Sequence, residues 1–241
     1  MDYQAFGDEA LLLEFGNQID PEINRKVVAL YQLLMAVDIE GVHFLTPAYT
    51  SLLIHFDNGF WNAEDLWERI NLLQDRQEYK WSETTSRLID IPVCYEDPFA
   101  MDMDSVMQKT GLSRKEVVHI HTATPYQVYM LGFLPGFAYM GVSPEALDCA
   151  RRETPRLEVP AQSVGLAGKQ TGIYPVNAPG GWQIIGRTPF SIFEPMQAEP
   201  MRLRPGDQIN FRAIKAKQYE IIEEKVRNQS YKWHIREYRS T

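Results

Sequence analysis

The sequence contains little cysteine and no long hydrophobic run. Only two of its 241 residues are cysteines, and the distance between Cys94 and Cys149 in the chain fits neither a metal-knuckle spacing nor a disulfide framework. No apolar run approaches the roughly 20 residues that span a bilayer, and the first residues lack the basic and apolar regions of a secretory signal. These absences predict a cytoplasmic protein that keeps its thiols reduced and contacts no membrane.

Positive charge is also scarce. The 24 Lys and Arg residues are outnumbered by 32 Asp and Glu residues, which gives a formal net charge of −8. Nucleic-acid binding requires clustered cationic side chains that replace the counterions of the phosphates. We therefore expect no nucleic-acid partner.

Several motifs that carry catalysis within one chain are missing as well. Residues 165–170 approach a P-loop, but the glycine spacing is wrong and Gln170 stands where Ser or Thr ligates magnesium. The sequence contains no Gly-x-Ser-x-Gly nucleophile elbow, no His-Glu-x-x-His zinc motif and no Met-Lys-Met biotin site. We expect no metal site in this chain, and an active site that a partner completes.

The first third of the chain alternates strand and helix patterns. Asp20 and Pro21 mark a helix start, because an N-cap is followed by proline at the first helical position, and Asn62 caps a second helix. Thr46 and Pro47 interrupt the strand pattern. Strands are expected at residues 10–15, 42–45 and 51–56. This pattern predicts an α+β domain at residues 1–85, with a polar linker at residues 74–87.

The remainder, residues 88–241, becomes β-rich after one well-marked helix. Ser113 and Glu116 form a capping box at the start of that helix, which is expected at residues 114–122. Short strands separated by Gly and Pro turns are typical of a barrel or sandwich. The expected strands are residues 127–131, 163–167, 172–176, 182–185, 191–193, 208–211 and 231–235, with a last helix at residues 216–227.

Glycine, proline and aromatic residues concentrate between residues 132 and 206. In the loop at residues 132–139, small residues permit close approach of the backbone, while aromatic rings, Tyr139 among them, can wall a site. A tightly packed barrel corner is the alternative. Gly180 and Gly181, followed by Trp182, can turn backbone N–H groups towards an anion, or they can form a hairpin turn.

Arginines lie close to these loops in the sequence. Arg151, Arg152 and Arg156 form one cluster, and Arg187 follows Gly186. A guanidinium group binds a carboxylate or phosphate through two parallel hydrogen bonds, so these residues are candidates for an anion site. Surface pairing with neighbouring glutamates is the alternative.

His121 is the candidate titrating side chain, because imidazole changes its charge near neutral pH and can transfer protons at an amide. It comes at the end of the helix expected at residues 114–122, where a histidine also interacts favourably with the helix dipole. A structural role for His121 therefore stands beside the catalytic one.

The glycine-rich and arginine-rich segments belong to an ordered set that extends along the chain. Its members are Phe6-Gly7-Asp8-Glu9-Ala10, His121 with Tyr126-x-Val128-Tyr129-Met130-Leu131-Gly132-Phe133-x-Pro135-Gly136-Phe137-x-Tyr139, Arg151-Arg152-x-x-Pro155-Arg156-x-x-Val159-Pro160, Ser163-Val164-Gly165-Leu166-Ala167-Gly168-x-Gln170-Thr171-Gly172-Ile173-Tyr174-Pro175, Pro179-Gly180-Gly181-Trp182-x-Ile184-Ile185-Gly186-Arg187-Thr188, and Gly206-Asp207-x-Ile209-x-Phe211. Together they resemble the family of 5-oxoprolinase B subunits (PxpB), which also includes the kinase inhibitor KipI and the subunit-1-like part of allophanate hydrolase and urea carboxylase proteins.

The resemblance implies a small N-terminal α+β domain joined to a cyclophilin-like β-barrel. It also implies two partners, the C subunit (PxpC-like) and the A subunit (PxpA-like) of 5-oxoprolinase. With these partners the chain would open 5-oxoproline, a small cyclic amide, to L-glutamate, using ATP with Mg at the level of the complex.

Such a reaction needs a grip on the substrate carboxylate, positive charge for phosphate and a proton shuttle. The residue chemistry within the family motifs then suggests His121 and Arg187 as catalytic residues. The expected substrate-binding residues are Arg156, Gln170, Tyr139, Gly180, Gly181 and Trp182.

One residue departs from the family pattern. Gln162 stands where the family more often has glycine. A side chain replaces a hydrogen there, so any role that needs close approach of the backbone at residue 162 is in doubt.

The resemblance leaves two other functions open. The chain could inhibit a sensor histidine kinase, as KipI does. It could also be a carboxyltransferase-type component of an enzyme that metabolises urea or allophanate, and it would then need a biotin carrier on a separate chain.

Overall fold

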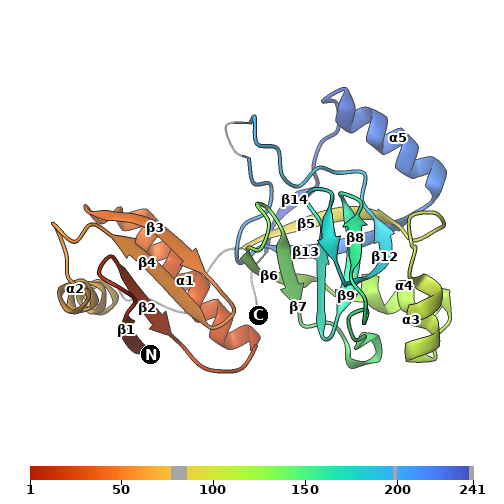
Figure 1. The fold of residues 1–241 in the computed structure, drawn as a ribbon. Helices are drawn as coiled ribbons and strands as arrows, with labels where there is room; N and C mark the ends of the chain where they lie inside the picture. The colour runs from red at the N-terminus through yellow and green to blue at the C-terminus, as the bar shows by residue number, and fades with distance from the viewer. Residues whose placement is uncertain (77–85, 198–199, 239–241) are drawn as a thin grey trace. The chain divides into compact units, whose positions relative to one another are not determined.

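The computed structural model describes residues 1–76, 86–197 and 200–238, and the chain divides into two compact units (Figure 1). Among the described residues, the first unit comprises 1–76 and the second comprises the remainder. Most of the linker predicted at residues 74–87 lies outside the described residues. Gln74 belongs to a helix of the first unit, and Arg87 belongs to a strand of the second.

The first unit is a four-stranded antiparallel sheet with the strand order β1-β2-β4-β3, packed against two helices. Alternate strand residues such as Leu11 and Ile54 point into the core, where they meet Leu30 of one helix and Leu66 of the other. The elements are β1 (Asp2–Ala5), β2 (Ala10–Glu14), α1 (Pro21–Val37), β3 (Val42–Pro47), β4 (Ser51–Phe56) and α2 (Ala63–Arg76).

Both predicted helix starts of this unit are confirmed. The Asp20 side chain accepts hydrogen bonds from the backbone of Glu22 and Ile23 at 2.7 and 3.2 Å, and Asn62 accepts one from the Asp65 backbone at 2.9 Å. The break expected at residues 46–47 is wrong, since β3 continues to Pro47. Proline is tolerated there because β3 lies at the edge of the sheet.

The second unit contains a closed barrel, which confirms the predicted α+β class with a barrel domain. Its sheet follows the order β12-β9-β10-β7-β6-β13-β5, and pairing of Arg187 on β12 with Cys94 on β5 closes the ring. β14 extends the sheet beyond β5, and β8 and β11 form a separate two-stranded ribbon. Apolar side chains such as Ile91, Val164 and Phe211 fill the interior, as in other small barrels.

The helices of this unit lie outside the barrel (Figure 1). α3 and α4 contact each other, and α4 packs on β13, whereas α5 contacts β5. The elements are β5 (Ser86–Cys94), α3 (Met103–Thr110), α4 (Arg114–Ala123), β6 (Tyr126–Leu131), β7 (Ala138–Gly141), the short 3-10 helix Glu145–Leu147, β8 (Arg156–Val159), β9 (Ser163–Ala167), β10 (Gln170–Ile173), β11 (Ala178–Gly180), β12 (Gln183–Arg187), β13 (Gln208–Ile214), α5 (Ala216–Arg227) and β14 (Ile235–Tyr238).

Most predicted elements of the second unit occur near their expected positions, and three expectations are corrected. The segment 191–193 is no strand, since its Phe193 makes only an isolated bridge to Met201. The last strand begins at Ile235 instead of residue 231. α3, which the sequence pattern does not indicate, begins at Met103, and the side chain of the preceding Asp102 makes no capping hydrogen bond.

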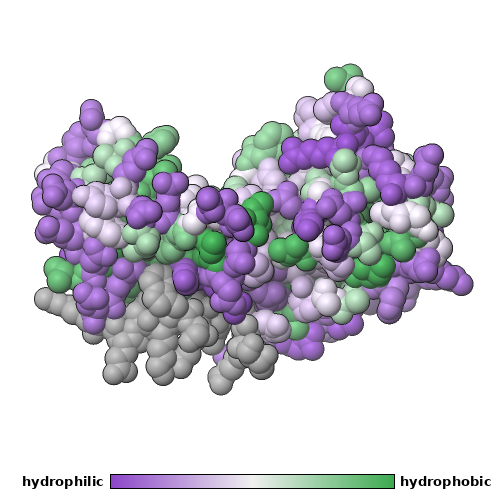
Figure 2. Space-filling model, turned by 90° about the horizontal axis from the view of Figure 1, so that it is seen from below, coloured by the Kyte–Doolittle hydropathy of each residue, from purple (hydrophilic) through white to green (hydrophobic). Residues whose placement is uncertain are grey.

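Polar side chains cover much of one face of the molecule. Figure 2 shows hydrophilic side chains over most of the visible face, with smaller hydrophobic patches between them. No helix among the described residues has the length and apolar character needed to cross a membrane.

Candidate functional site

A small pocket lies where the β6–β7 loop meets the segment that follows β11. Its volume is about 120 Å³. Five aromatic residues, one arginine and the segment 179–181 line it, namely Phe133, Phe137, Tyr139, Tyr174, Trp182, Arg151, Pro179, Gly180 and Gly181. The volume equals that of about four water molecules at their liquid density, so the pocket suits a small ligand.

Phe137 holds the aromatic walls of the pocket together. Its ring centroid lies 4.6 Å from that of Tyr139, 5.0 Å from Tyr174 and 5.4 Å from Trp182. Two of these contacts are edge-to-face, with interplanar angles of 89° and 79°, and such aromatic pairs add about 0.5–1.5 kcal/mol each beyond their buried area. The walls are therefore built as a packed cluster.

The β6–β7 loop places Phe133 and Phe137 through a tight turn. The Phe137 N–H donates to the Leu134 carbonyl at 3.0 Å, and the Gly132 N–H donates to the Phe137 carbonyl at 3.1 Å. Gly136 has φ +80°, and a Cβ there would lie 2.7 Å from Cβ of Phe193. Only glycine fits this position, and the turn leaves the Phe133 ring 72% exposed beside the pocket.

Gly180 brings the chain against Tyr174. A Cβ on Gly180 would lie 2.2 Å from the Tyr174 hydroxyl oxygen, whereas a Cβ on Gly181 would have no neighbour within 3.6 Å. The two glycines therefore differ in what they do. Gly180 is required for close packing against Tyr174, whereas a Cβ on Gly181 would meet the Arg152 carbonyl and Pro155 at ordinary contact distances.

Asp102 fixes two of the arginines beside this site. The carboxylate is 3% exposed. It accepts hydrogen bonds from Arg152 at 3.1 Å, from Arg156 and from the Ile184 backbone at 2.7 Å. The buried negative charge is thus paired and hydrogen-bonded, as a buried carboxylate must be.

Arg151 differs from its two neighbours. Within the described part of the chain it makes no ion pair, and its Cζ lies 6.0 Å from the centroid of the Trp182 ring. That distance permits a cation–π interaction, which orients the guanidinium without neutralising it. Arg151 is therefore the side chain best placed to meet an anionic group in the pocket.

The tyrosines of the pocket are neutral hydroxyl donors and acceptors. Burial raises the pKa of Tyr139, and the charge of Arg151 opposes this only in part. Burial likewise raises the pKa of Tyr174, against smaller opposing contributions from the Trp182 backbone, Arg151 and Arg156. Both phenols can hydrogen-bond to a ligand, and neither is poised to act as a base near neutral pH.

The structure brings four of the sequence-predicted residues together in this pocket, namely Tyr139, Gly180, Gly181 and Trp182. Arg156 pairs with Gly180 across the β8–β11 ribbon, so it lies next to the pocket. Its guanidinium binds Asp102, and its Nη1 is buried without a hydrogen-bond partner among the described residues. The position of Arg156 fits a supporting role better than direct contact with a substrate.

His121 lies elsewhere, in the barrel core. It is 0% exposed, and its ring stacks on Phe211 with centroids 4.6 Å apart. The Thr171 hydroxyl donates to the Gly165 carbonyl at 3.0 Å, so it accepts from His121 Nε2–H at 2.9 Å. His121 Nδ1 then accepts from the Tyr95 hydroxyl at 2.7 Å.

These contacts satisfy both ring nitrogens of a neutral imidazole. Burial lowers the pKa of His121 to about 3, which keeps it uncharged at neutral pH. The geometry favours a core-building role for His121, and the proton-shuttle role expected from the sequence does not fit this buried position.

Gln170 and Arg187 are also absent from the pocket lining. Gln170 lies at the start of β10, paired with Gly141 and Ala167. Arg187 lies at the end of β12, where its Nε donates to the Ala161 carbonyl at 2.9 Å. Their roles in substrate binding and catalysis stay predictions, which the position of this pocket does not support.

The site includes residues that the sequence-based choice missed. Arg151 belongs to the recognised arginine cluster, but sequence alone could not show that Asp102 engages the other two members. Phe133 and Phe137 lie in the aromatic loop that is expected to wall a site. Tyr174 carries no signal of its own in the sequence, because only its contact with Gly180 places it here.

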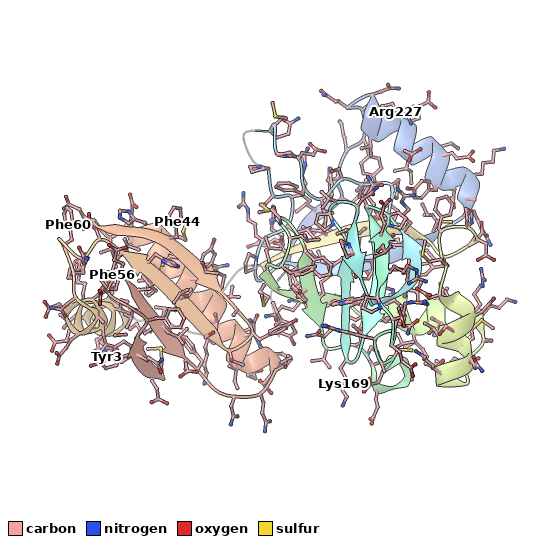
Figure 3. All side chains as sticks on the ribbon, in the orientation of Figure 1. Tyr3, Phe44, Phe56, Phe60, Lys169 and Arg227 are labelled. Carbon is pink, nitrogen blue, oxygen red and sulfur yellow. The ribbon has the colours of Figure 1, made fainter. Side chains whose placement is uncertain are left out.

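The P-loop-like segment does not form a phosphate-binding loop. Its residues build the β9–β10 hairpin, and Lys169 at the turn projects away from the barrel (Figure 3). A P-loop needs a helix after its glycines, and here a strand follows. Among the described residues, no group of three or more His, Cys, Asp or Glu side chains is arranged to hold a metal ion.

Comparison with known proteins finds a matching family model and similar named sequences. The family model described as carboxyltransferase domain, subdomain C and D, matches residues 1–203. A Bacillus subtilis protein, named as the B subunit of 5-oxoprolinase, is 37% identical over 92% of this chain and 96% of its own length. A protein of the same name from Escherichia coli O157:H7 is 40% identical over 85% of this chain and 92% of its own.

A solved structure, that of the protein TTHA0988, has the same architecture. It superimposes with a TM-score of 0.76 at 33% identity and covers 86% of this chain. The chain spans only 40% of that protein, so the relative joins a unit of this kind to a longer polypeptide.

Proposed function

The chain belongs to the family of 5-oxoprolinase B subunits and matches the model of carboxyltransferase subdomains C and D, and we propose that it is the B subunit of an ATP-dependent 5-oxoprolinase. Two relatives that match this chain over nearly their full length carry that name. The single structural observation that supports the proposal is the small aromatic pocket with Arg151 at Trp182.

The proposed substrate is 5-oxoproline, a five-membered lactam that carries one carboxylate. The Arg151 guanidinium would bind the carboxylate through a charge-assisted hydrogen bond, and the rings of Tyr139 and Trp182 would flank the lactam. A volume of about 120 Å³ matches a ligand of this class better than a nucleotide, since pockets for drug-sized ligands measure about 300–1,000 Å³.

The net reaction consumes 5-oxoproline, ATP and two molecules of water and yields L-glutamate, ADP and phosphate. ATP with Mg supplies the phosphoryl group that activates the lactam carbonyl oxygen. One water adds to the carbonyl carbon, the C–N bond breaks and the ring nitrogen takes up a proton, which leaves an acyl phosphate. A second water adds to that carbon, and phosphate leaves with the former carbonyl oxygen. In this reaction Arg151 holds the carboxylate and the aromatic walls limit the access of further water.

The nucleotide is assigned to the complex and not to a loop of this chain. The β9–β10 hairpin does not fit a triphosphate, because no helix N-terminus follows its glycines. We accordingly propose that the C and A subunits, the partners implied by the family, complete the active site. In this proposal the substrate binds in the pocket of this chain, and the nucleotide binds in the complex at a place other than the β9–β10 hairpin.

Reconstitution tests the proposal. The purified chain is assayed for glutamate formation from 5-oxoproline, alone and with its cognate C and A subunits, each with and without ATP and Mg. The expected result is turnover only when all three proteins and ATP are present. Turnover by the chain alone, or none with both cognate partners, would contradict it.

A carboxyltransferase-type function is the second candidate, and the description of the matched family favours it. Such a protein would exchange a carboxyl group with biotin on a separate carrier chain. Adding the protein to a carboxylated biotin carrier and measuring loss of the carboxyl group, with urea as acceptor, separates this function from lactam hydrolysis. Urea-dependent transfer without 5-oxoproline turnover would select it.

A further inference from the structure

We propose that the second unit contains another ligand site, at which a small organic anion with an apolar body binds between α4 and the end of β13. The cavity has a volume of about 570 Å³, which lies within the usual range of about 300–1,000 Å³ for small-molecule sites. Its lining residues are Tyr95, Glu96, Arg114, Lys115, Val118, His119, Ala213, Ile214 and Lys215. It shares none of them with the pocket at Trp182, so it goes beyond the proposed function.

The floor of this cavity is apolar. Val118 packs partly against the barrel core, and Ile214 ends β13 beside it. The Tyr95 ring is 4% exposed, and its hydroxyl is already engaged with His121, so the ring offers its apolar surface. An apolar floor removes the hydrocarbon part of a ligand from water, which is worth about 25 cal/mol per Å² of buried surface.

The rim carries an excess of positive charge. Arg114, Lys115 and Lys215 contribute three cationic groups, against one carboxylate, that of Glu96. Lys115 makes no ion pair within the described part of the chain. The Arg114 guanidinium forms an exposed ion pair with Asp97 at 3.2 Å, and surface ion pairs are weak.

The ionised carboxylate of Glu96 is stabilised by hydrogen bonds at this rim. Its side chain accepts from Lys215 Nζ at 2.8 Å and from the Ala216 N–H, at the start of α5, at 2.9 Å. These hydrogen bonds lower the pKa of Glu96. Lys115 and His119 lie one turn apart on the same stripe of α4, so the opposite side of the rim still presents donors to a second anion.

A pair of fluorescent probes tests the site in the full chain. The anion 8-anilinonaphthalene-1-sulfonate and the neutral N-phenyl-1-naphthylamine share an apolar body and differ in the sulfonate. We expect saturable binding of the anion, and a Lys115→Glu variant should weaken it about fivefold or more while changing binding of the neutral probe less than about twofold. Glutamate is favourable in the first turn of a helix, so this variant keeps α4 intact.

Matched variants control for position and volume. Lys217→Glu places the same charge reversal at the equivalent first-turn position of α5, outside the cavity lining, and should leave both probes unaffected. Val118→Trp and the more exposed Ala213→Trp fill the cavity and should each weaken both probes about tenfold. Two independent blocking variants keep the test valid if one of them fails to fold.

The proposal is overturned by any of the following outcomes. The anionic probe shows no saturable binding, the cavity-filling variants that fold bind it as tightly as the parent protein, or Lys115→Glu weakens the neutral probe as much as the anionic one. An equal effect of Lys217→Glu and Lys115→Glu would also overturn it, since general electrostatics would then account for the binding.

Discussion

Arg151 lies over Trp182, with its Cζ 6.0 Å from the centroid of the indole ring. The neighbouring Arg152 and Arg156 are both bound by the buried carboxylate of Asp102. The three arginines of this sequence cluster therefore have different structural roles. Two of them fix the backbone around the pocket, and Arg151 keeps its charge available at the pocket wall.

Replacing Asp102 with asparagine should destabilise the second unit by about 2–3 kcal/mol. The substitution removes the negative charge that pairs with Arg152 and Arg156, and hydrogen bonds to charged groups are worth about 1.5–3 kcal/mol. The two arginines are partly exposed, so water limits the loss. Denaturant unfolding measures it, with Asp97→Asn, an exposed partner of Arg114, as a control expected to change stability by less than about 1 kcal/mol. Equal effects of the two variants would contradict the role given to Asp102.

Gly180→Ala and Gly181→Ala should differ sharply in thermal stability. The added methyl at residue 180 overlaps the Tyr174 hydroxyl oxygen at 2.2 Å, whereas at residue 181 its nearest neighbour is 3.6 Å away. Overpacking of this kind costs about 1–3 kcal/mol, so we expect Gly180→Ala to lower the unfolding midpoint and Gly181→Ala to change it little. Similar thermal unfolding curves for the two variants would show that Tyr174 does not pack closely against residue 180.

His121 should make the protein less stable in acid. The pKa of a histidine in the unfolded chain is about 6.5, and burial lowers the pKa of His121 to about 3. Below pH 6.5 the unfolded chain binds a proton that the folded protein excludes, so the stabilisation present at neutral pH is lost as the pH falls. Between pH 7 and pH 5 the loss from this residue is about 2 kcal/mol.

A His121→Phe variant isolates that contribution. Phenylalanine retains the stacking on Phe211 but does not titrate, so the free energy of unfolding should fall less between pH 7 and pH 5 than in the parent protein. The free energy of unfolding is measured by urea titration at each pH. The loss between pH 7 and pH 5 should be smaller in the variant than in the parent protein by about 2 kcal/mol. Parallel pH profiles would contradict the buried, neutral state of His121.

Gln162→Gly should stabilise the protein slightly. Gln162 has φ +68°, in the left-handed region that costs a residue with a side chain about 1–2 kcal/mol. Glycine relieves this strain but increases the entropy of the unfolded chain, so the expected net gain is about 0.5 kcal/mol. Ala161→Gly, at a neighbour outside that region, should give no gain. A lower unfolding midpoint for Gln162→Gly would contradict the strain.

Local signals in the sequence predict local structure well. Asp20 and Ser113 can be identified as helix caps because their hydrogen bonds are made within three residues. Gly180, Gly181 and Trp182 can be named as candidates for a site, since glycines beside an aromatic residue are visible in the sequence. A hairpin turn is the alternative that the sequence leaves open. β1 escapes prediction because it has only four residues and all of them are exposed.

Long-range contacts account for what the sequence could not predict. Nothing near His121 in the chain reveals that Tyr95 and Thr171 enclose it. The ion pair of Arg156 with Asp102 could not be predicted for a similar reason, because the two residues lie 54 positions apart in the chain. Pairings of this kind depend on barrel closure, which places distant segments side by side.

The kinetics of an Arg151→Ala variant test the central claim most directly. In the complex reconstituted with the C and A subunits, we expect the variant to raise KM for 5-oxoproline about tenfold or more, since a charge-assisted contact to the substrate carboxylate is lost. The unfolding midpoint should stay unchanged. Arg227→Ala, at the exposed end of α5 (Figure 3), should leave both KM and kcat as they are. Unchanged KM and kcat in Arg151→Ala, in an active complex, would contradict the assignment of this pocket to the substrate.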